Sequence, residues 1–562
     1  MKKVITYSLA IAAVAGLTGC NGKMNQFQAD YFTTNPNPLE VVGTQVPATV
    51  NGNIPAKFFK KNAVVTVTPV LVYASGETAS APVTFQGEKV RGNNPVINYG
   101  FGNSISIPVN YTYTPAMQKS ELYLTFNVQQ GNKTYALPRV KVADGVVATA
   151  ALADAGTVNP ALAPDAFQRI INEKYSAQIR FIINQANIRK NQIDSPEMLS
   201  LNEQLRNAAA AKNREIQEIN IESYASPDGP LSFNTKLAEK RETNTKGFVN
   251  DRLKKDKITE FGELTAQFTP EDWEGFQKLV AASNIQDKEL ILSILQQTKD
   301  PEIRDQRIRD LSNVFETLAE EILPQLRYSK ITASIDVIGK SDAEINAAFD
   351  TNPASLSVEE LLYAATLTDN NNRKQAIYEA VTKYYPNDYR GYNDLGLAQY
   401  VNKDYKSALK NFNKAAQLAP NATEPKMNQG LVSLLNKDYN AANRSFGSAA
   451  GQQGLGDALG VYYLTQGDNA AAVKAFSNSK SNNAALAQIL TKDYSAAKNT
   501  LAAVANPNAT TYYLTAVLGA RTNNTAMAAS NLKKAIALDP SLATNALNDL
   551  EFSKIDVKSL VK

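Results

Sequence analysis

The sequence predicts a multidomain protein: an N-terminal all-β, sandwich-like domain, a central α+β domain with a helical insertion, and a C-terminal α-helical solenoid. At 562 residues the chain is too long for one hydrophobic core. Its composition, 43% hydrophobic and 20% charged residues, is that of a folded protein. Alternating β-branched stretches fill the first part, and helical stretches with small residues at a regular spacing fill the last.

Composition also narrows the classes of function. The chain contains no histidine, which removes the commonest general base and the commonest nitrogen ligand of metals. A Ser-His-Asp or Cys-His mechanism is therefore excluded. The net charge of +4 is too small to indicate binding to nucleic acid. We expect no enzyme activity, no cofactor and no metal, although a peptidoglycan hydrolase that uses carboxylates remains a less favoured alternative.

The only cysteine, Cys20, follows a short export signal. Lys2 and Lys3 are positively charged, residues 5–17 are mostly apolar, and the stretch is too short to span a membrane. Leu-Thr-Gly-Cys at 17–20 resembles the lipobox of bacterial lipoproteins. The resemblance implies that residues 1–19 are a signal peptide and that Cys20 is acylated. Several acyl chains would anchor the protein stably to a membrane.

The residues after Cys20 bear on location. Residues 21–25 contain no acidic side chain. Resemblance to the sorting patterns of lipoproteins of Bacteroidetes type implies the outer membrane, with the protein facing the periplasm, and leaves the cell surface as the alternative. Residues 20–47, which are polar and contain Asn-Pro-Asn-Pro, are expected to be a linker.

The first folded domain is expected over residues 48–149. Three stretches within it alternate or are rich in β-branched residues, and Gly, Asn and Pro turns separate them: 63–73, 104–113 and 121–128. Several short strands of this kind predict a small β-sandwich. Residues 150–165, rich in Ala, Gly and Pro, are expected to be a second linker.

An α+β domain is expected over residues 166–345. Its strands and helices alternate along the sequence, as in folds with helices packed on one face of a sheet. A mostly helical insertion, which contains the only tryptophan, Trp273, is expected over 256–328. We expect Trp273 to pack against the insertion helices rather than to stack on a sugar. The strands are expected at 176–183, 219–224 and 330–338, and the helices start at 194 and after 229.

The stretch 219–249 carries the strongest signature in this domain. A strand ends in the turn Ser-Pro-Asp-Gly, and the helix that follows has Asn234, Leu237 and Arg241 at fixed spacing. This pattern resembles the signature of the OmpA-like peptidoglycan-binding family. In that family an acid in the turn and the arginine of the helix hold the diaminopimelate of the wall peptide. Arg241 matches that arginine, the acid position falls on Ser226, and Asp228 lies two residues later.

The resemblance implies four candidate residues for peptidoglycan binding: Arg241, Asn234, Asp228 and Ser226. An arginine is suited to this task because its guanidinium binds a carboxylate through two parallel hydrogen bonds. A wall-binding domain on a lipid-anchored chain would tether the envelope to peptidoglycan.

The last part of the chain, 355–548, is expected to form a helical solenoid. One unit has seven residues that match the tetratricopeptide repeat (TPR) positions: Tyr392, Leu395, Gly396, Ala408, Phe412, Ala415 and Pro420. The pattern repeats, and the turn Lys-Asp-Tyr recurs at 403, 437 and 492. Stacked TPR units present an extended surface, which we expect to bind partner proteins of the envelope. Residues 549–562 are expected to be a tail.

Together these features predict a non-enzymatic outer-membrane lipoprotein that tethers the envelope to peptidoglycan and scaffolds partner proteins through its TPR units. The alternative is a component of an outer-membrane assembly or secretion complex, in which the OmpA-like domain binds protein instead of peptidoglycan.

Overall fold

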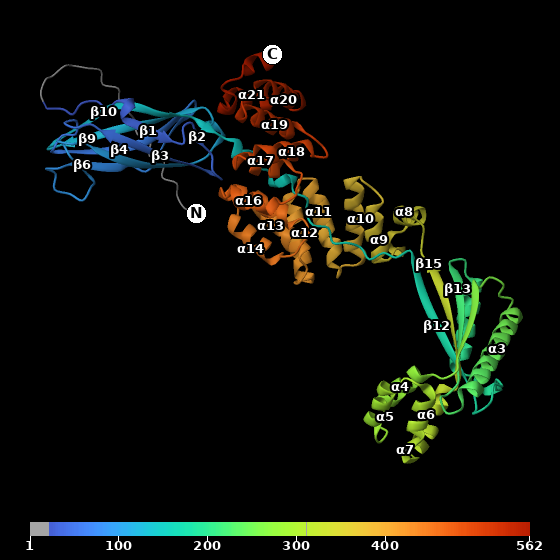
Figure 1. Cartoon of the computed structure of the whole chain (residues 1–562). Coiled ribbons are helices and arrows are strands. Elements are labelled where there is room, and N and C mark those ends of the chain that lie inside the picture. The colour runs from blue at the N-terminus through green and yellow to red at the C-terminus, as the bar shows by residue number, and fades with distance from the viewer. Residues whose placement is uncertain (1–21, 311, 562) are drawn as a thin grey trace. The chain divides into compact units, whose positions relative to one another are not determined.

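Residues 22–310 and 312–561 are described by the structure, which is a computed structural model (Figure 1). The expected signal peptide and Cys20 lie outside these residues. The chain forms two units, one made of residues up to Ala163 together with those from Tyr385, the other of Pro164–Tyr384. The first unit holds a β domain and the solenoid, and the chain leaves it after Ala163 and returns at Tyr385.

The β domain packs two sheets, antiparallel except for one strand pair, around one core, as the sequence predicts for a sandwich. Inward-facing residues alternate with outward-facing ones, most regularly in β3 (Gln45–Ile54) and β9 (Ser120–Gln130). One sheet has the order β1-β3-β8: Phe32–Asn35, Gln45–Ile54 and Asn103–Thr112. The other has the order β10-β9-β4-β6-β7, with β5 beside β4: Lys133–Asp144, Ser120–Gln130, Ala63–Tyr73, Val83–Gly87, Val96–Ile97 and Gly76–Ala79.

This domain begins earlier in the chain than the expected boundary at residue 48. Met24, Phe27 and Phe32 are buried in its core, and the Phe27 ring stacks on the Phe126 ring with centroids 4.2 Å apart. The Asn-Pro-Asn-Pro stretch lies between β1 and β2 (Leu39–Glu40), and β2 pairs in parallel with β11 (Val146–Val147). These prolines therefore mark a connection inside the domain, not a linker in front of it.

The second unit contains a four-stranded sheet of order β12-β15-β13-β14, in which β12 and β13 both pair with β15 in antiparallel register. One face of the sheet packs with the helices into a hydrophobic core. The elements are β12 (Ile170–Arg180), α1 (Lys190–Ile193), α2 (Pro196–Ala210), β13 (Arg214–Tyr224), α3 (Leu231–Lys255), β14 (Glu263–Thr269) and β15 (Tyr328–Ile338).

The region expected to be a helical insertion contains one strand. β14 pairs in parallel with β13, from Glu218 opposite Glu263 to Tyr224 opposite Thr269. Its side chains show no clean alternation of burial, as is usual for an edge strand, so the sequence pattern did not reveal it. The helical part starts at Trp273 and has a core of its own, against which Trp273 packs. It comprises α4 (Trp273–Ala282), α5 (Lys288–Gln297), α6 (Pro301–Arg309), α7 (Ser312–Thr317), η5 (Leu318–Ile322) and η6 (Leu323–Leu326).

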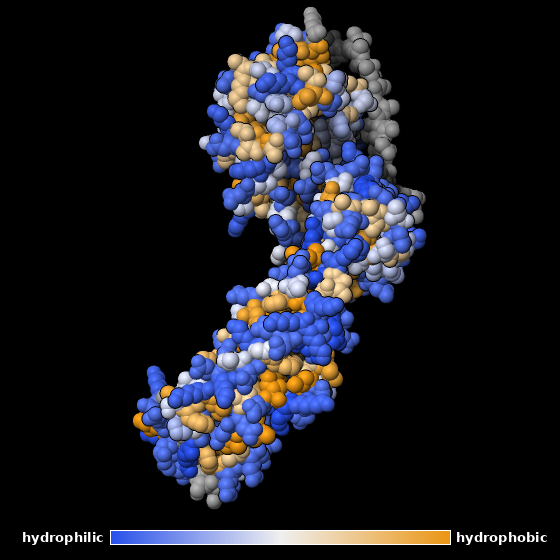
Figure 2. Space-filling view, turned by 90° about the vertical axis from the view of Figure 1, so that its right-hand side faces the viewer, coloured by the Kyte–Doolittle hydropathy of each residue, from blue (hydrophilic) through white to orange (hydrophobic). Residues whose placement is uncertain are grey.

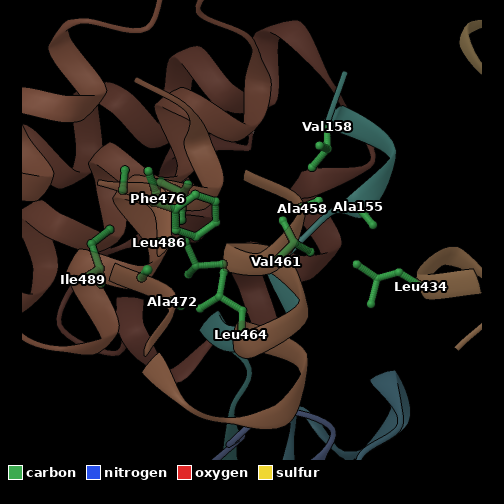
Figure 3. Packing of buried hydrophobic residues seen from close by; sticks show 14 of the residues in the cluster. Ala155, Val158, Leu434, Ala458, Val461, Leu464, Ala472, Phe476, Leu486 and Ile489 are labelled. Carbon is green, nitrogen blue, oxygen red and sulfur yellow. The ribbon is translucent and has the colours of Figure 1, made fainter. Parts of the chain in front are cut away.

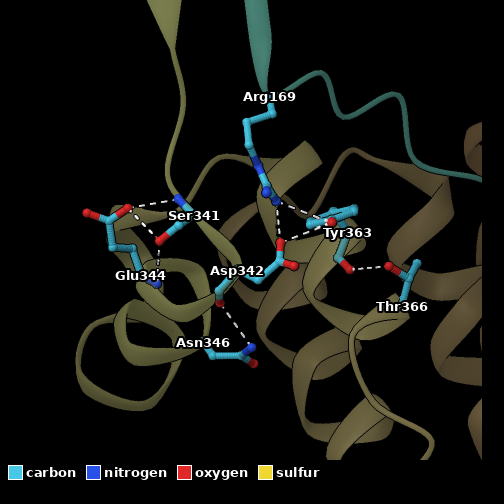
Figure 4. Close-up of polar contacts among 7 residues, drawn as sticks. All are labelled: Arg169, Ser341, Asp342, Glu344, Asn346, Tyr363 and Thr366. Atoms are coloured by element: carbon cyan, nitrogen blue, oxygen red, sulfur yellow. Dashed lines mark hydrogen bonds and ion pairs between the residues drawn. The ribbon is translucent and has the colours of Figure 1, made fainter.

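Three helices complete the second unit: α8 (Asp342–Thr351), α9 (Val358–Thr366) and α10 (Asn371–Tyr384). Arg169, next to the first residue of β12, pairs with Asp342 of α8, and the Tyr363 hydroxyl donates to the same carboxylate at 3.0 Å (Figure 4). Ser341 and Glu344 form a capping box at the start of α8. The first helix pair of the expected solenoid, α9 and α10, is thus grouped with the α+β unit.

The solenoid of the first unit consists of five successive pairs of antiparallel helices, the architecture of TPR units. Lys403, Lys437 and Lys492 adopt positive φ, and the aspartate after each caps the second helix of its pair. This confirms the turn expected from Lys-Asp-Tyr. The pairs are α11/α12 (Tyr389–Val401, Tyr405–Leu418), α13/α14 (Glu424–Leu435, Tyr439–Ser448), α15/α16 (Leu455–Gln466, Asn469–Phe476), α17/α18 (Asn482–Leu490, Tyr494–Ala502) and α19/α20 (Ala509–Arg521, Thr525–Leu538).

A small residue lies where the two helices of a pair cross. A Cβ placed on Gly430 of α13 would come within 2.4 Å of the Phe446 ring of α14, so only glycine allows this approach. Gly396 with Phe412, and Gly460 with Phe476, repeat the arrangement. Figure 3 shows Phe476 and Ala472 of α16 packed with Leu464 of α15 and Leu486 of α17.

The residues expected to be a C-terminal tail pack onto the last helix pair. Phe552 is buried, and the Tyr513 hydroxyl of α19 donates to the Asp549 carboxylate at 2.7 Å. Contacts of η8 with α19 and of α22 with α20 cover the last helix pair, as capping segments do in solenoids. The segment contains η8 (Leu550–Phe552) and α22 (Val557–Leu560), and α21 (Leu542–Asn548) comes directly before it.

We predict opposite effects of the same substitution at two glycines in neighbouring helices. Gly430→Ala should destabilise the solenoid by ~1–3 kcal/mol, because the methyl group overlaps the Phe446 ring. Gly447→Ala in α14 should stabilise it by ~0.5–1 kcal/mol, because a Cβ there meets nothing within 4 Å. Chemical denaturation followed by far-UV circular dichroism measures both, and equal effects would contradict the packing.

Candidate functional site

The turn after β13 contains two of the expected ligand residues, Ser226 and Asp228. Both bond to Arg327, which the sequence analysis did not single out. The Ser226 hydroxyl donates to the Asp228 carboxylate at 2.6 Å, and Arg327 donates to the other carboxylate oxygen at 2.8 Å. Arg327 Nε also donates to the Ser226 hydroxyl at 3.1 Å. The ion pair is largely buried, with side-chain exposures of 10% for Arg327 and 16% for Asp228. Arg327 immediately precedes β15, far from the signature in sequence.

Arg241 lies on α3 and is completely buried, with 0% exposure. Its guanidinium donates to three backbone carbonyl oxygens, those of Tyr224 at 2.8 Å, Gln185 at 3.0 Å and Ile182 at 3.3 Å. The central carbon of the guanidinium, Cζ, lies 5.0 Å from the centre of the Phe181 ring. Burial, and the nearby Arg327, lower the pKa of Arg241 to about 10, so it stays charged at neutral pH. The guanidinium therefore links α3 to the end of β13 and to the segment after β12.

Asn234, in the first turns of α3, fastens the turn to the helix. Its amide nitrogen donates to the Gly229 carbonyl at 2.9 Å. The four candidate residues therefore surround one turn, but the charged pair that the family signature predicts is divided. Asp228 bonds to Arg327, whereas Arg241 bonds to backbone carbonyls.

The helical insertion packs onto the same turn. Pro227 lines a small apolar cavity together with insertion residues Trp273, Phe276, Ile308, Phe315, Leu318 and Leu323. Arg309 of α6 donates to the Asp228 carbonyl at 2.5 Å. The insertion thus contacts the turn through both apolar packing and a charged hydrogen bond.

A second site lies in the solenoid. The segment expected to be a linker runs along the surface formed by the first helices of the pairs, α11, α13, α15 and α17, which we call the inner face (Figure 1). From Ala153 to Ala163 it contains the short 3-10 helix η4 (Ala155–Thr157) and is otherwise without regular structure. We call residues 153–163 the strap. It connects the β domain to the start of the second unit.

Asparagine amides bind the strap at Ala161. The Ala161 N–H donates to Asn428 Oδ1 at 2.6 Å, and Asn428 Nδ2 donates back to the Ala161 carbonyl at 2.8 Å. Asn393 Nδ2 donates to the same carbonyl at 2.9 Å. Asn393 and Asn428 are completely buried and bond to each other at 3.0 Å. An extended backbone pairs with side-chain amides here as it would with a neighbouring strand.

Two further polar contacts hold the other parts of the strap. Asn483 of α17 accepts from the Asp154 N–H at 3.0 Å and donates to the Asp154 carbonyl at 2.9 Å. The Tyr400 hydroxyl donates to the Ala155 carbonyl at 2.9 Å. Asn483 Nδ2 also donates to the Thr157 hydroxyl oxygen at 3.0 Å, so this end of the strap is held through backbone and side-chain atoms. The contacts at Ala155, Ala161 and Ala163 are made to backbone atoms alone.

Asp394 accepts a hydrogen bond from the Ala163 N–H at 2.9 Å. It also accepts from Asn393 Nδ2 at 3.0 Å. Burial raises the pKa of Asp394 to about 8, although both hydrogen bonds and the positive charge of Arg390 act in the opposite direction. The carboxyl group is therefore mostly protonated at neutral pH.

Small side chains of the strap fill the inner face. Ala155, Val158, Ala161 and Ala163 are each no more than 8% exposed. Figure 3 shows Ala155 and Val158 beside Ala458 and Val461 of α15. The space that the strap occupies therefore accepts alanine-sized side chains at these positions.

Three polar residues of the inner face occupy the same position in their repeats, and the sequence analysis missed them. Each lies two residues before the small residue at the helix crossing and ten before the residue that caps the second helix. The members are Asp394, Asn428 and Asn483, with Gly396, Gly430 and Ala485 as the small residues and Asp404, Asp438 and Asp493 as the caps. A polar residue that recurs at one buried repeat position is the signal that would have found them.

A charged contact joins the β domain to the end of the solenoid. The Thr149 hydroxyl donates to Glu551 at 2.5 Å, and Arg521 of α19 pairs with the same carboxylate at 2.5 Å. Both ionised side chains are mostly buried, with exposures of 14% for Arg521 and 8% for Glu551. Together with the strap, this contact makes the β domain and the solenoid one unit.

Other surfaces offer less definite sites. On the face shown in Figure 2, hydrophobic residues lie in small groups among hydrophilic ones. Within residues 22–310 and 312–561, no group of three or more acidic or cysteine residues is placed to hold a metal ion. The same described residues include no helix that is both long and apolar enough to span a membrane.

Comparison with known proteins gives limited information. No family model and no curated protein matches the chain. Solved structures similar to part of it include pilF of Pseudomonas aeruginosa, at 17% identity over 38% of this chain and 99% of that chain, with a TM-score of 0.29. A tetratricopeptide repeat protein of Parabacteroides merdae matches at 15% identity over 39% of this chain and 89% of that chain, with a TM-score of 0.29. YrrB, a TPR protein, matches at 21% identity over 32% and 98%, with a TM-score of 0.25.

We predict that Asp394 makes solenoid stability depend on pH. Because the folded pKa of about 8 exceeds the ordinary aspartate value, the folded state keeps a proton that the unfolded chain loses. Stability should therefore fall as pH rises from about 5 to 8, by about 1.4 kcal/mol per pH unit from this group. Asp394→Asn, which mimics the protonated acid, should remove this slope.

Chemical denaturation of the wild type and of Asp394→Asn at several pH values measures the difference between their free energies of unfolding. The contributions of all other titrating groups are the same in both proteins and cancel in this difference. The variant should be the more stable protein at pH 8. Parallel pH profiles of the two proteins would show that Asp394 keeps its ordinary pKa.

We predict strong coupling between Arg327 and Asp228. Removing either side chain should destabilise the second unit by ~2–4 kcal/mol, because each leaves a largely buried charge without its partner. The double variant should cost less than the sum of the two. Trp273, the only tryptophan, lies in this unit, so its fluorescence can follow the unfolding.

The exposed pair Glu274–Lys278 on α4, with side-chain exposures of 80% and 74%, is a matched control whose coupling should not exceed ~0.5 kcal/mol. Equal coupling energies for the two pairs would contradict the special role of Arg327.

Proposed function

We propose that this protein is a non-enzymatic scaffold that holds envelope proteins together through its solenoid. The observation that carries the proposal is the strap: the inner face binds an extended backbone through Asn393, Asn428 and Asn483. A surface built to hold an extended polypeptide is suited to protein partners. The contact of Thr149 and Arg521 with Glu551 supports the proposal, because it gives the scaffold a fixed geometry within the first unit.

The scaffold is proposed to act at the outer membrane, on its periplasmic side. The lipobox-like sequence before Cys20 supports acylation of that residue, and the lack of acidic residues at 21–25 supports the location. Labelling with radioactive palmitate tests the anchor: we expect incorporation into the wild type and none into Cys20→Ser.

For the α+β domain we propose a role in protein contacts, as in an outer-membrane assembly or secretion complex. The support is local: Arg241 is completely buried, and Asp228 is bonded to Arg327 and covered in part by the helical insertion. A wall peptide would have to displace these contacts before it reached either charge.

Tethering of the envelope to peptidoglycan remains the second candidate function. The spacing of Asn234 and Arg241, which matches the OmpA-like signature, favours it. In that case the diaminopimelate carboxylate would replace the Tyr224 carbonyl or the Asp228 carboxylate as a partner of the buried arginines.

We predict that sedimentation with purified peptidoglycan sacculi separates the two functions. The wild-type protein should stay in the supernatant, because its arginines are already engaged. Sedimentation of the wild type, lost in Arg241→Lys without loss of the Trp273 fluorescence signal, would instead support the tether, because lysine lacks the paired donors that hold a carboxylate.

Capture from detergent-solubilised envelopes tests the scaffold itself. We expect the wild type to retain a reproducible set of proteins, and a variant with Asn428→Ala and Asn393→Ala to lose members of this set. Retention of the same proteins by both would exclude the inner face as the scaffold surface.

A further inference from the structure

The net free energy with which the strap binds the inner face is small. Seven hydrogen bonds join its backbone to solenoid side chains, namely those of Asn483, Tyr400, Asn428, Asn393 and Asp394. The net free energy of each bond is small, and the four buried small side chains add a modest hydrophobic contribution. The conformational entropy lost on ordering the eleven residues 153–163 opposes both.

The covalent connection therefore decides whether the strap stays bound. Because both of its ends belong to the same chain, its local concentration at the inner face is of the order of millimolar. A segment that binds by itself with modest affinity is held in place under these conditions. A competing peptide must overcome this local concentration, but it needs no rearrangement of the helices.

The chemistry of the site is independent of which chain supplies the backbone. Asn428 bonds both the N–H and the carbonyl of one residue, so it requires only an extended segment with neither group engaged. The buried positions of Ala161 and Ala163 require small side chains. Leu162 between them is 45% exposed, so that position accepts any residue.

We propose that the strap is an exchangeable occupant of the inner face, and that the solenoid binds an extended segment of a partner protein in its place. The segment carries alanine or another small residue at the two positions that Ala161 and Ala163 fill now. This inference rests on the proposed scaffold function and names the class of partner for it. The strap keeps the inner face closed until such a partner is present.

The test is a peptide titration with the full-length protein. The probe is a fluorescein-labelled peptide with the sequence of residues 153–165, and fluorescence anisotropy measures its binding. The wild type should bind it weakly, because the strap competes. A variant with Ala161→Trp and Ala163→Trp, whose strap no longer fits, should bind at least ten times more tightly.

Three controls make the result specific. Adding Asn428→Ala to the strap variant gives a triple variant, which should bind the peptide at least ten times more weakly than the strap variant does. A second peptide, with tryptophan at the Ala161 position, should bind the strap variant just as weakly. Ala161→Leu is a milder second variant in case the double one folds poorly, and far-UV circular dichroism checks the helical content of each.

Two outcomes would overturn the proposal. One is failure of the expected difference in peptide affinity. A folded strap variant that does not bind the peptide would show that the inner face does not take a separate segment, and equal binding by the wild type would show that the strap does not compete. The other is a dimer of the strap variants or the wild type in sedimentation analysis that disappears on adding Asn428→Ala, because the inner face would then take the strap of a second copy. Either result would leave the envelope capture experiment to judge the scaffold function independently.

Discussion

The bond between Asn428 and the backbone of Ala161 is the contact on which the organisation of the first unit depends. A buried peptide group must find partners for its N–H and its carbonyl, and the extended strap has no neighbouring strand to supply them. Asn428, with Asn393 beside it, supplies both. Because the strap is bound, its buried residues belong to the hydrophobic core of the helices after residue 385, and the β domain before it belongs to the same unit. A segment that would otherwise be a loose connection thereby becomes part of the fold.

In the second unit, the buried polar groups near the turn 226–229 also find their partners within the fold. In the family that the sequence resembles, the turn acid and the helix arginine face a ligand. Here Arg241 bonds to the carbonyls that end β13 and follow β12, and Asp228 bonds to Arg327. The charges that would meet a wall peptide therefore stabilise the domain itself. The helical insertion, packed on Pro227, adds to this closure.

Much of the fold follows from local sequence patterns. Alternation predicts the sandwich strands, and the small residues at the helix crossings, such as Gly430, predict the solenoid because they meet a large ring on the next helix. The strand β14 was missed because an edge strand needs no regular alternation. The strap was assigned as a linker because Ala, Gly and Pro favour turns locally, whereas its structure depends on helices more than 200 residues away.

The candidate sites were less accessible to sequence analysis for the same reason. Ser226, Asp228, Asn234 and Arg241 lie in or near one turn, but nothing in their spacing shows that Arg327 also bonds to it. Asp394, Asn428 and Asn483 recur at one repeat position, yet their ligand lies in another part of the chain. Residue spacing defines neighbours within one element, whereas the partner of a buried polar group is chosen by the tertiary fold.

Hydrogen exchange of the strap amides in the native full-length protein tests the central claim most directly. The N–H groups of Asp154, Ala161 and Ala163 donate to buried or half-buried side chains of the solenoid. They should therefore exchange orders of magnitude more slowly than the same residues in a free peptide, and Asn428→Ala should accelerate the exchange of Ala161. Exchange of these amides at the rate of an unstructured peptide in the wild type would show that the strap is not bound.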